Sequence, residues 1–94
     1  MTTTADAAPT ESTVQTVADG REQLDEIDAQ IRALVAQRRE ISAQVQQLRR
    51  AAGGPRIEHA RENEILSRYG DALGRPGVSL ALAILEICRG HTNA

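Results

Sequence analysis

The chain has 94 residues, which is enough for one small domain. Its 11 basic residues, all arginine, stand against 13 acidic ones, and the net charge of −2 gives no general reason to bind nucleic acid or an anionic membrane. Tyr69 is the only aromatic residue, so the core must be built from aliphatic side chains, which suits packed helices better than sheets.

Cysteine and histidine usage limits the class of protein further. Cys88 is the only cysteine, so no disulfide can form within the chain, which fits a reducing cytoplasm. His59 and His91 are too far apart for metal-ligand spacing. The first residues lack a basic start followed by an apolar run, and no stretch approaches the ~18 apolar residues of a membrane-spanning helix. We therefore expect a cytoplasmic protein without a metal centre.

A flexible tail and one long helix are expected in the first half of the chain. Residues 1–19 are rich in Thr, Ala and Ser without hydrophobic periodicity, which predicts the tail, and residues 20–94 would form the domain. From about Gly20 to Ala52, apolar residues recur at steps of three and four, which predicts a helix with a heptad seam that Asp19 could cap and Gly53 would end. The seam comprises Leu24, Ile27, Ile31, Leu34, Ile41, Val45 and Leu48.

The length of this helix predicts a dimer. A helix of about 32 residues is ~48 Å long, whereas a compact globule of this chain length is roughly 30 Å across. The apolar seam therefore needs a partner along its whole length. Two long helices packed together in a homodimer would supply that partner, and small chains often depend on such assembly.

Two shorter helices are expected in the second half. Residues 57–69 have apolar contacts at Ile57, Ile65, Leu66 and Tyr69, and residues 70–77, with three Gly and one Pro, predict a turn. The last helix, residues 78–89, is apolar nearly all round, which predicts that it is buried.

Arg38 occupies a seam position where Leu or Ile is expected. Burying an unpaired charge is costly, so this side chain needs an anionic partner, either a neighbouring acid of the protein or a ligand, unless it snorkels to solvent. Arg49 lies about three turns further along the same face, about 16 Å away along the axis. The two arginines could hold one small anion between them over Val45.

Other charged residues allow two interpretations each. Arg21 is about 26 Å from Arg38 along the axis and roughly 100° around it, so only an antiparallel partner could bring it to that site; otherwise it is an ordinary surface residue. Glu58 and Glu62, with Arg61 beside them, form either a solvated face or a group that accepts hydrogen bonds from a substrate hydroxyl and orients pocket arginines. Fixed cations without a nucleophile suit reactions that need only positioning and electrostatic stabilisation.

The residues that break the apolar pattern also resemble a known family. The first long helix is similar to that of the all-helical (type II) chorismate mutases, and the similarity covers residues 21–69. It is carried by R-x-x-L-D-x-I-D at residues 21–28, L-V-x-x-R-R at 34–39, the basic Arg49, and the second-helix start at Pro55, Arg56, Ile57, Arg61 and Glu62. The resemblance implies an all-α fold in which three helices per chain, one long and two short, form an intertwined homodimeric six-helix bundle.

The resemblance also implies a reaction and roles for the arginines. The chain would catalyse the Claisen rearrangement of chorismate to prephenate, in phenylalanine and tyrosine biosynthesis, without cofactor, metal or covalent intermediate. Arg38 and, from the other subunit, Arg21 would bind the two carboxylates of chorismate. Arg49 would hydrogen-bond the ether oxygen and one carboxylate as the C–O bond breaks, and Arg61 would help to bind the ring carboxylate or brace the acidic pair.

For the acidic residues, the resemblance implies that Glu62 accepts a hydrogen bond from the C4 hydroxyl of chorismate, with Glu58 in support. Val45 and Cys88 complete the expected lining. The better-known family members carry a Ser and a Gln in the third helix, whereas no Gln occurs in residues 86–92 here and Cys88 lies near the Ser position. This departure leaves open which residues replace that pair.

The short turn at residues 70–77 and the end of the pattern after Arg89 resemble a short actinobacterial-type subgroup. In that subgroup, complex formation with 3-deoxy-D-arabino-heptulosonate 7-phosphate synthase activates the mutase. We expect residues 86–94 to form the contact surface for that synthase.

Three alternatives remain at this point. Isochorismate-pyruvate lyases share the fold and a similar arginine pocket. A non-catalytic helical dimerisation module would explain the seam, although it gains nothing from Arg38 and Arg49 on one face. A nucleic-acid-binding stripe of Arg38, Arg39, Arg49 and Arg50 is disfavoured by the net charge and the lack of stacking residues.

Overall fold

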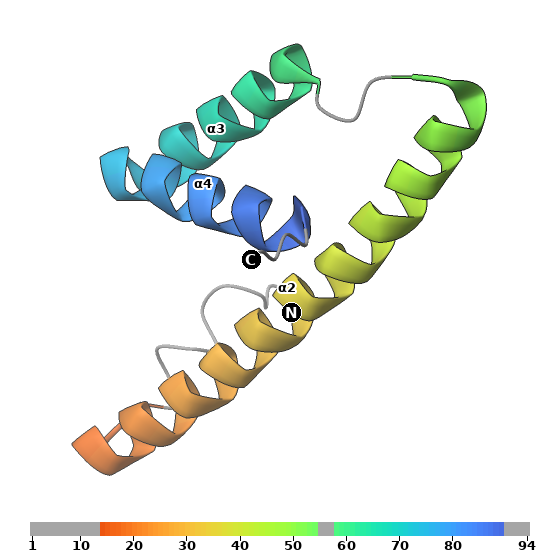
Figure 1. The fold of residues 1–94 in the computed structure, drawn as a ribbon. Coiled ribbons are helices and arrows are strands. Elements are labelled where there is room, and N and C mark those ends of the chain that lie inside the picture. The colour runs from red at the N-terminus through yellow and green to blue at the C-terminus, as the bar shows by residue number, and fades with distance from the viewer. Residues whose placement is uncertain (1–13, 55–57, 90–94) are drawn as a thin grey trace, which may run out of the picture. The chain divides into compact units, whose positions relative to one another are not determined.

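The computed structural model describes residues 14–54 and 58–89, and these form three helices and no strand (Figure 1). The helices are α2 (Val17–Ala52), α3 (His59–Leu73) and α4 (Arg75–Arg89). The expected all-α class, with one long and two short helices, is confirmed. The chain divides into two units, Met1–Ala33 and Leu34–Ala94, and α2 runs from the first into the second. Most of the expected tail lies outside the described residues.

Both ends of α2 are fixed by local hydrogen bonds. The helix begins three residues earlier than expected because Thr16, and not Asp19, caps it: the Asp19 N–H donates to Thr16 Oγ1 at 3.0 Å. Asp19 lies instead in the first turn, where a carboxylate is favourable to the helix dipole. At the other end Gly53 adopts φ +80°, and the amides of Gly53 and Gly54 donate to carbonyls of the last turn at 3.1 and 2.9 Å. These two bonds form a Schellman motif at the place where the sequence predicts the end.

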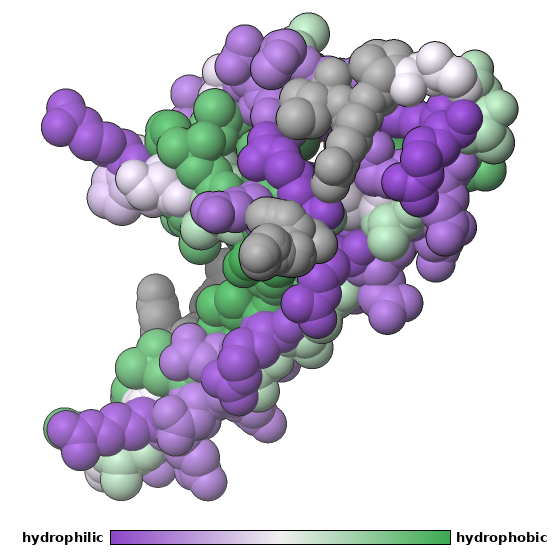
Figure 2. Space-filling view, in the orientation of Figure 1, coloured by the Kyte–Doolittle hydropathy of each residue, from purple (hydrophilic) through white to green (hydrophobic). Residues whose placement is uncertain are grey.

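The apolar seam of α2 is uncovered in the single chain. No residue of α2 is buried. On the face shown in Figure 2, hydrophobic surface is open along α2 and over α3 and α4. The exposed seam residues are Leu24, Ile27, Ile31, Leu34, Ile41, Val45 and Leu48.

The turn between α3 and α4 is much shorter than expected, and the prediction of a turn over residues 70–77 is wrong. Gly74, with φ +80°, is the only residue between the two helices. The other glycines serve helix packing: a Cβ on Gly77 would meet the Tyr69 carbonyl oxygen and lie 2.7 Å from the Leu73 Cβ. Pro76 is compatible with the first turn of α4, where its missing N–H costs no helical hydrogen bond.

The core of the described chain lies between α3 and α4. Ile65, Ala81 and Leu85 are buried together, with Leu66 and Tyr69 packed against them. The expectation that the last helix is buried all round is only partly met, because one face of α4 is buried while Leu80, Leu82 and Ile87 stay exposed. This apolar face of α4 remains exposed because none of the three described helices covers it.

Candidate active site

A pocket of about 230 Å³ lies within the unit Leu34–Ala94, where the second half of α2 meets α3 and α4. This volume suits a small metabolite and not a dinucleotide-sized ligand. Its lining consists of Arg38, Ile41, Ser42, Val45, Gln46, Arg49, Glu58, Arg61, Glu62, Ile65, Leu85, Cys88 and Arg89.

Helical spacing explains how α2 contributes to this pocket. Arg38, Ser42, Val45 and Arg49 recur at steps of three and four, so they form one stripe on α2. The structure places Arg38 and Arg49 on the same pocket, with Val45 between them. The roles that the sequence predicts for them stay predictions.

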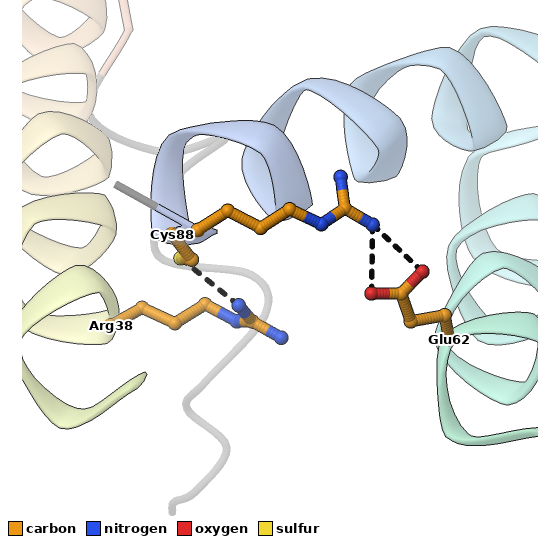
Figure 3. A network of polar contacts seen from close by, with 4 residues as sticks. Arg38, Glu62 and Cys88 are labelled. Atoms are coloured by element: carbon orange, nitrogen blue, oxygen red, sulfur yellow. Dashed lines mark hydrogen bonds and ion pairs between the residues drawn. The ribbon is translucent and has the colours of Figure 1, made fainter. Parts of the chain in front are cut away.

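Arg38 is half-buried and reaches across the pocket toward α4 (Figure 3). Its Nη1 donates to the Sγ of the buried Cys88 at 3.1 Å. No ion pair between Arg38 and a carboxylate is present in residues 14–54 and 58–89. Since a thiol is only a weak acceptor, the guanidinium keeps most of its capacity to bind an anion.

Arg49 is held by Glu58. Its Nη2 lies 3.2 Å from Glu58 Oε2, and the side chains are 23% and 46% exposed. The pair joins the end of α2 to the residue just before α3. Glu58 therefore restricts where the Arg49 guanidinium can lie, as one of the two sequence interpretations proposes.

Glu62 is engaged by a residue that the sequence analysis did not assign to the pocket. Arg89, the last residue of α4, places its Nη2 2.8 Å from both carboxylate oxygens of Glu62. The side chains are 36% and 23% exposed. Of the other predicted residues, Arg61 lines the pocket, whereas Arg21 is exposed on α2 and is not among the lining residues.

The lining is cationic. Four arginines and two glutamates leave a formal charge of +2, which matches a small dicarboxylate. No histidine is among the lining residues, so Cys88 has no imidazole base beside it there. Among the described residues, no group of three or more His, Cys, Asp or Glu side chains could hold a metal ion.

Sequence reasoning missed three polar residues of the pocket. Ser42 and Gln46 follow Arg38 by four and eight residues, so the helical repeat that relates Arg38 to Arg49 could have found them. Arg89 could not be found in this way, because its place depends on how α4 packs on α3. Arg89 and Cys88 are the last two pocket residues of α4. This is the helix in which better-known family members carry a Ser and a Gln, and the sequence did not say which residues replace them here.

Three helices around a pocket of net positive charge define an all-helical protein whose pocket suits a small dianion. The chain belongs to the chorismate mutase type II family, whose model matches residues 20–87. The family and the enzyme class that the sequence indicates are thereby confirmed.

The similar proteins from two organisms both bear the name "Intracellular chorismate mutase". That of Mycolicibacterium smegmatis is 40% identical over 91 residues, which cover 97% of this chain and 82% of the relative. That of Mycobacterium tuberculosis is 43% identical over 71 residues, covering 76% of this chain and 67% of the relative. Within the described residues, no helix is long and apolar enough to cross a membrane.

A solved structure has the same fold. It is the non-covalent complex of DAHP synthase and chorismate mutase from Corynebacterium glutamicum with a bound transition state analogue. The match has a TM-score of 0.75 at 30% identity and covers 82% of this chain and 93% of the other.

Proposed function

We propose that the pocket binds chorismate and converts it to prephenate by a Claisen rearrangement, and that the active form is a homodimer. The observation that carries this proposal is Arg38: a half-buried cation, on a pocket of net positive charge, paired with a thiol and with no described carboxylate. Burying such a group is costly unless an anion compensates it, and a substrate carboxylate would do so.

Binding both carboxylates would do much of the catalytic work. Chorismate must adopt a compact conformer before its reacting carbons can meet, so rigid anchoring of its two anionic groups lowers the entropic barrier. Arg38 would bind one carboxylate, and Arg21 of the second copy would bind the other. Arg61 would support the ring carboxylate from α3.

Arg49 would stabilise the transition state. Negative charge grows on the ether oxygen as the C–O bond lengthens, so a fixed guanidinium beside it binds the transition state more tightly than the ground state. The ion pair with Glu58 supports this role, because a cation that is already held in place needs little reorganisation during the reaction.

Glu62 would accept a hydrogen bond from the C4 hydroxyl of chorismate. Its carboxylate is engaged by Arg89, but an ionised carboxylate offers about four lone-pair positions and one cation does not fill them. Val45 and Cys88 would form the apolar lining between the polar groups.

The uncovered seam of α2 supports the homodimer. A 36-residue helix with no buried residue, exposing Leu34 at 61% and Leu48 at 71%, leaves a long apolar stripe in water. At about 25 cal/mol per Å² of apolar surface, covering that stripe with a second copy is strongly favourable. In an antiparallel pair, each copy's Arg21 would approach the middle of the other's long helix.

A complex with DAHP synthase, the 3-deoxy-D-arabino-heptulosonate 7-phosphate synthase, is the second partner that we propose. The solved relative from Corynebacterium glutamicum is such a complex, which supports activation by the same partner here. The proposed contact surface is residues 86–94. Only residues 86–89 of it are described, and among them Ile87 is an exposed apolar side chain. The name of the relatives supports a cytoplasmic location.

The direct test is the disappearance of chorismate, followed with and without the synthase. We expect prephenate as the product and a higher turnover when the synthase is present. An unchanged rate would contradict activation, and no prephenate under either condition would contradict the proposed function.

The same assay with isochorismate separates the lyase alternative. Salicylate and pyruvate from isochorismate, without prephenate from chorismate, would make the chain an isochorismate-pyruvate lyase. A folded dimer that converts neither compound would instead support a non-catalytic dimerisation module.

A further inference from the structure

The contact between Arg89 and Glu62 joins the end of one helix to the start of another. Glu62 lies in the first turn of α3 and Arg89 in the last turn of α4. One guanidinium nitrogen, Nη2, donates to both carboxylate oxygens at 2.8 Å (Figure 3). Both residues line the pocket. This is a tertiary contact, because the two residues are 27 positions apart in the sequence.

A second ion pair on α3 provides the comparison. Arg68 and Glu64 are separated by one helical turn, and Arg68 Nη2 lies 3.1 Å from Glu64 Oε2. Their side chains are 65% and 55% exposed. Pairs of this kind on a helix surface contribute a few tenths of a kcal/mol and position nothing beyond themselves. In the pair of Arg89 with Glu62, the distance between nitrogen and oxygen is shorter, the two side chains are less exposed, and both residues line the pocket.

Two consequences follow for the chemistry of Glu62. The first concerns position: a charge-assisted contact of Arg89 to both oxygens holds the Glu62 carboxylate at one place, so its remaining lone pairs stay on the pocket. The second concerns charge, since an uncompensated carboxylate on the lining would repel a dianion. Without Arg89 the lining would fall from a formal charge of +2 to +1.

We propose that Arg89 is a positioning residue for the reaction, which orients the Glu62 carboxylate toward the substrate hydroxyl and offsets its charge. This inference rests on the proposed function. It places Arg89 in the machinery of the pocket, in addition to any part it has in the surface of residues 86–94. A merely structural role of the ion pair would lower the free energy of unfolding and leave kcat/KM of the folded chain unchanged.

A double-mutant cycle in the full-length chain tests this proposal. Arg89→Ala should lower kcat/KM about tenfold in the wild-type background, and less than about twofold in a Glu62→Gln background, where there is no charge to offset. Arg89→Lys should keep most of the activity, because the contact uses a single nitrogen that an ammonium can replace. Arg68→Ala is the matched control and should leave kcat/KM unchanged.

The outcomes are distinguishable. Losses that multiply in the Arg89→Ala/Glu62→Gln double variant, or a Lys variant as poor as the Ala variant, would overturn the inference while the wild-type activity stands. Equal losses for Arg89→Ala and Arg68→Ala would overturn it as well. A wild-type chain that does not convert chorismate would overturn the proposed function and this inference with it.

Discussion

Arg38 is the residue where the two interpretations of the long helix differ. A dimerisation seam gains nothing from a cation at that position, whereas an anion-binding pocket requires one. The side chain is half-buried and donates to the Cys88 thiol, a weak acceptor that leaves room for a stronger one. This geometry favours the pocket over the simple seam.

Replacing Arg38 by Ala should therefore abolish most of the activity. We expect kcat/KM to fall by at least about a hundredfold, since a fixed charge aimed at the substrate is lost, while far-UV circular dichroism stays helical. Arg38→Lys should recover only part of the loss, because an ammonium lacks the planar fork that grips a carboxylate. Arg39→Ala, at the exposed neighbouring position, is the control. A variant at position 38 that keeps most of its kcat/KM would remove Arg38 from the site.

Glu58→Gln should loosen Arg49 without unfolding the chain. The Glu58 side chain is 46% exposed, so the ion pair contributes under about 1 kcal/mol to the free energy of unfolding. Its effect on catalysis should be larger, with kcat reduced several-fold and KM little changed, because Arg49 acts in the transition state. Glu64→Gln breaks the exposed pair with Arg68 and serves as the matched control. Equal kcat values for the two variants would argue against the positioning role of Glu58.

Individual site residues could be predicted from sequence only where helical periodicity carries the information. The spacing of Arg38, Val45 and Arg49 on one helix is enough to put them on one face, and the structure has all three on the pocket. The contacts of Cys88 with Arg38 and of Arg89 with Glu62 depend on the packing of separate helices. No local pattern encodes those distances.

At the scale of elements, the glycines of α3 and α4 show why the expected turn was too long. A run rich in Gly and Pro predicts a turn by composition. Here Gly74 alone supplies the left-handed residue, while Gly70 and Gly77 allow the two helices to approach closely: a Cβ on Gly70 would lie 3.0 Å from Val78 Cγ2. The end of α2 at Gly53 was predicted correctly. Its start was placed three residues too late, because Thr16 and not Asp19 is the capping residue.

Gly77→Val should separate α3 from α4. The new side chain would meet the Tyr69 carbonyl and the Leu73 Cβ, so the helices must move apart at a cost of roughly 1–3 kcal/mol in the free energy of unfolding. Urea denaturation measures that loss. Gly54→Ala is the control, because its Cβ would find only ordinary contact, 3.8 Å from the Arg49 carbonyl oxygen. Equal stability of the two variants would contradict this account of the helix pair.

At the scale of the whole molecule, the exposed seam is the feature that the single chain leaves unexplained. The spacing of apolar residues predicts the seam, and the length of the helix predicts that the seam needs a partner. The described residues leave that stripe uncovered. A small core around Ile65, Ala81 and Leu85 is little for a chain of this size. Assembly is therefore expected to supply much of the stability.

Ile31→Glu should weaken the dimer and the activity together. Ile31 is 51% exposed in the single chain and lies in the seam, so a charge there would be buried against the second copy. Ala29→Glu places the same charge on the opposite face of α2 and should leave assembly intact. Sedimentation measures the state of both variants. A monomeric wild-type chain that is fully active would rule out the shared pocket.

The most direct test of a pocket shared by two copies is complementation between inactive variants. Arg21→Ala and Arg38→Ala should each be nearly inactive alone. When the two are mixed and allowed to exchange subunits, half of the dimers are mixed and one of their two pockets is intact, so about a quarter of the wild-type activity should return. If the mixture stays as inactive as its components although mixed dimers form, the two arginines do not meet in one site.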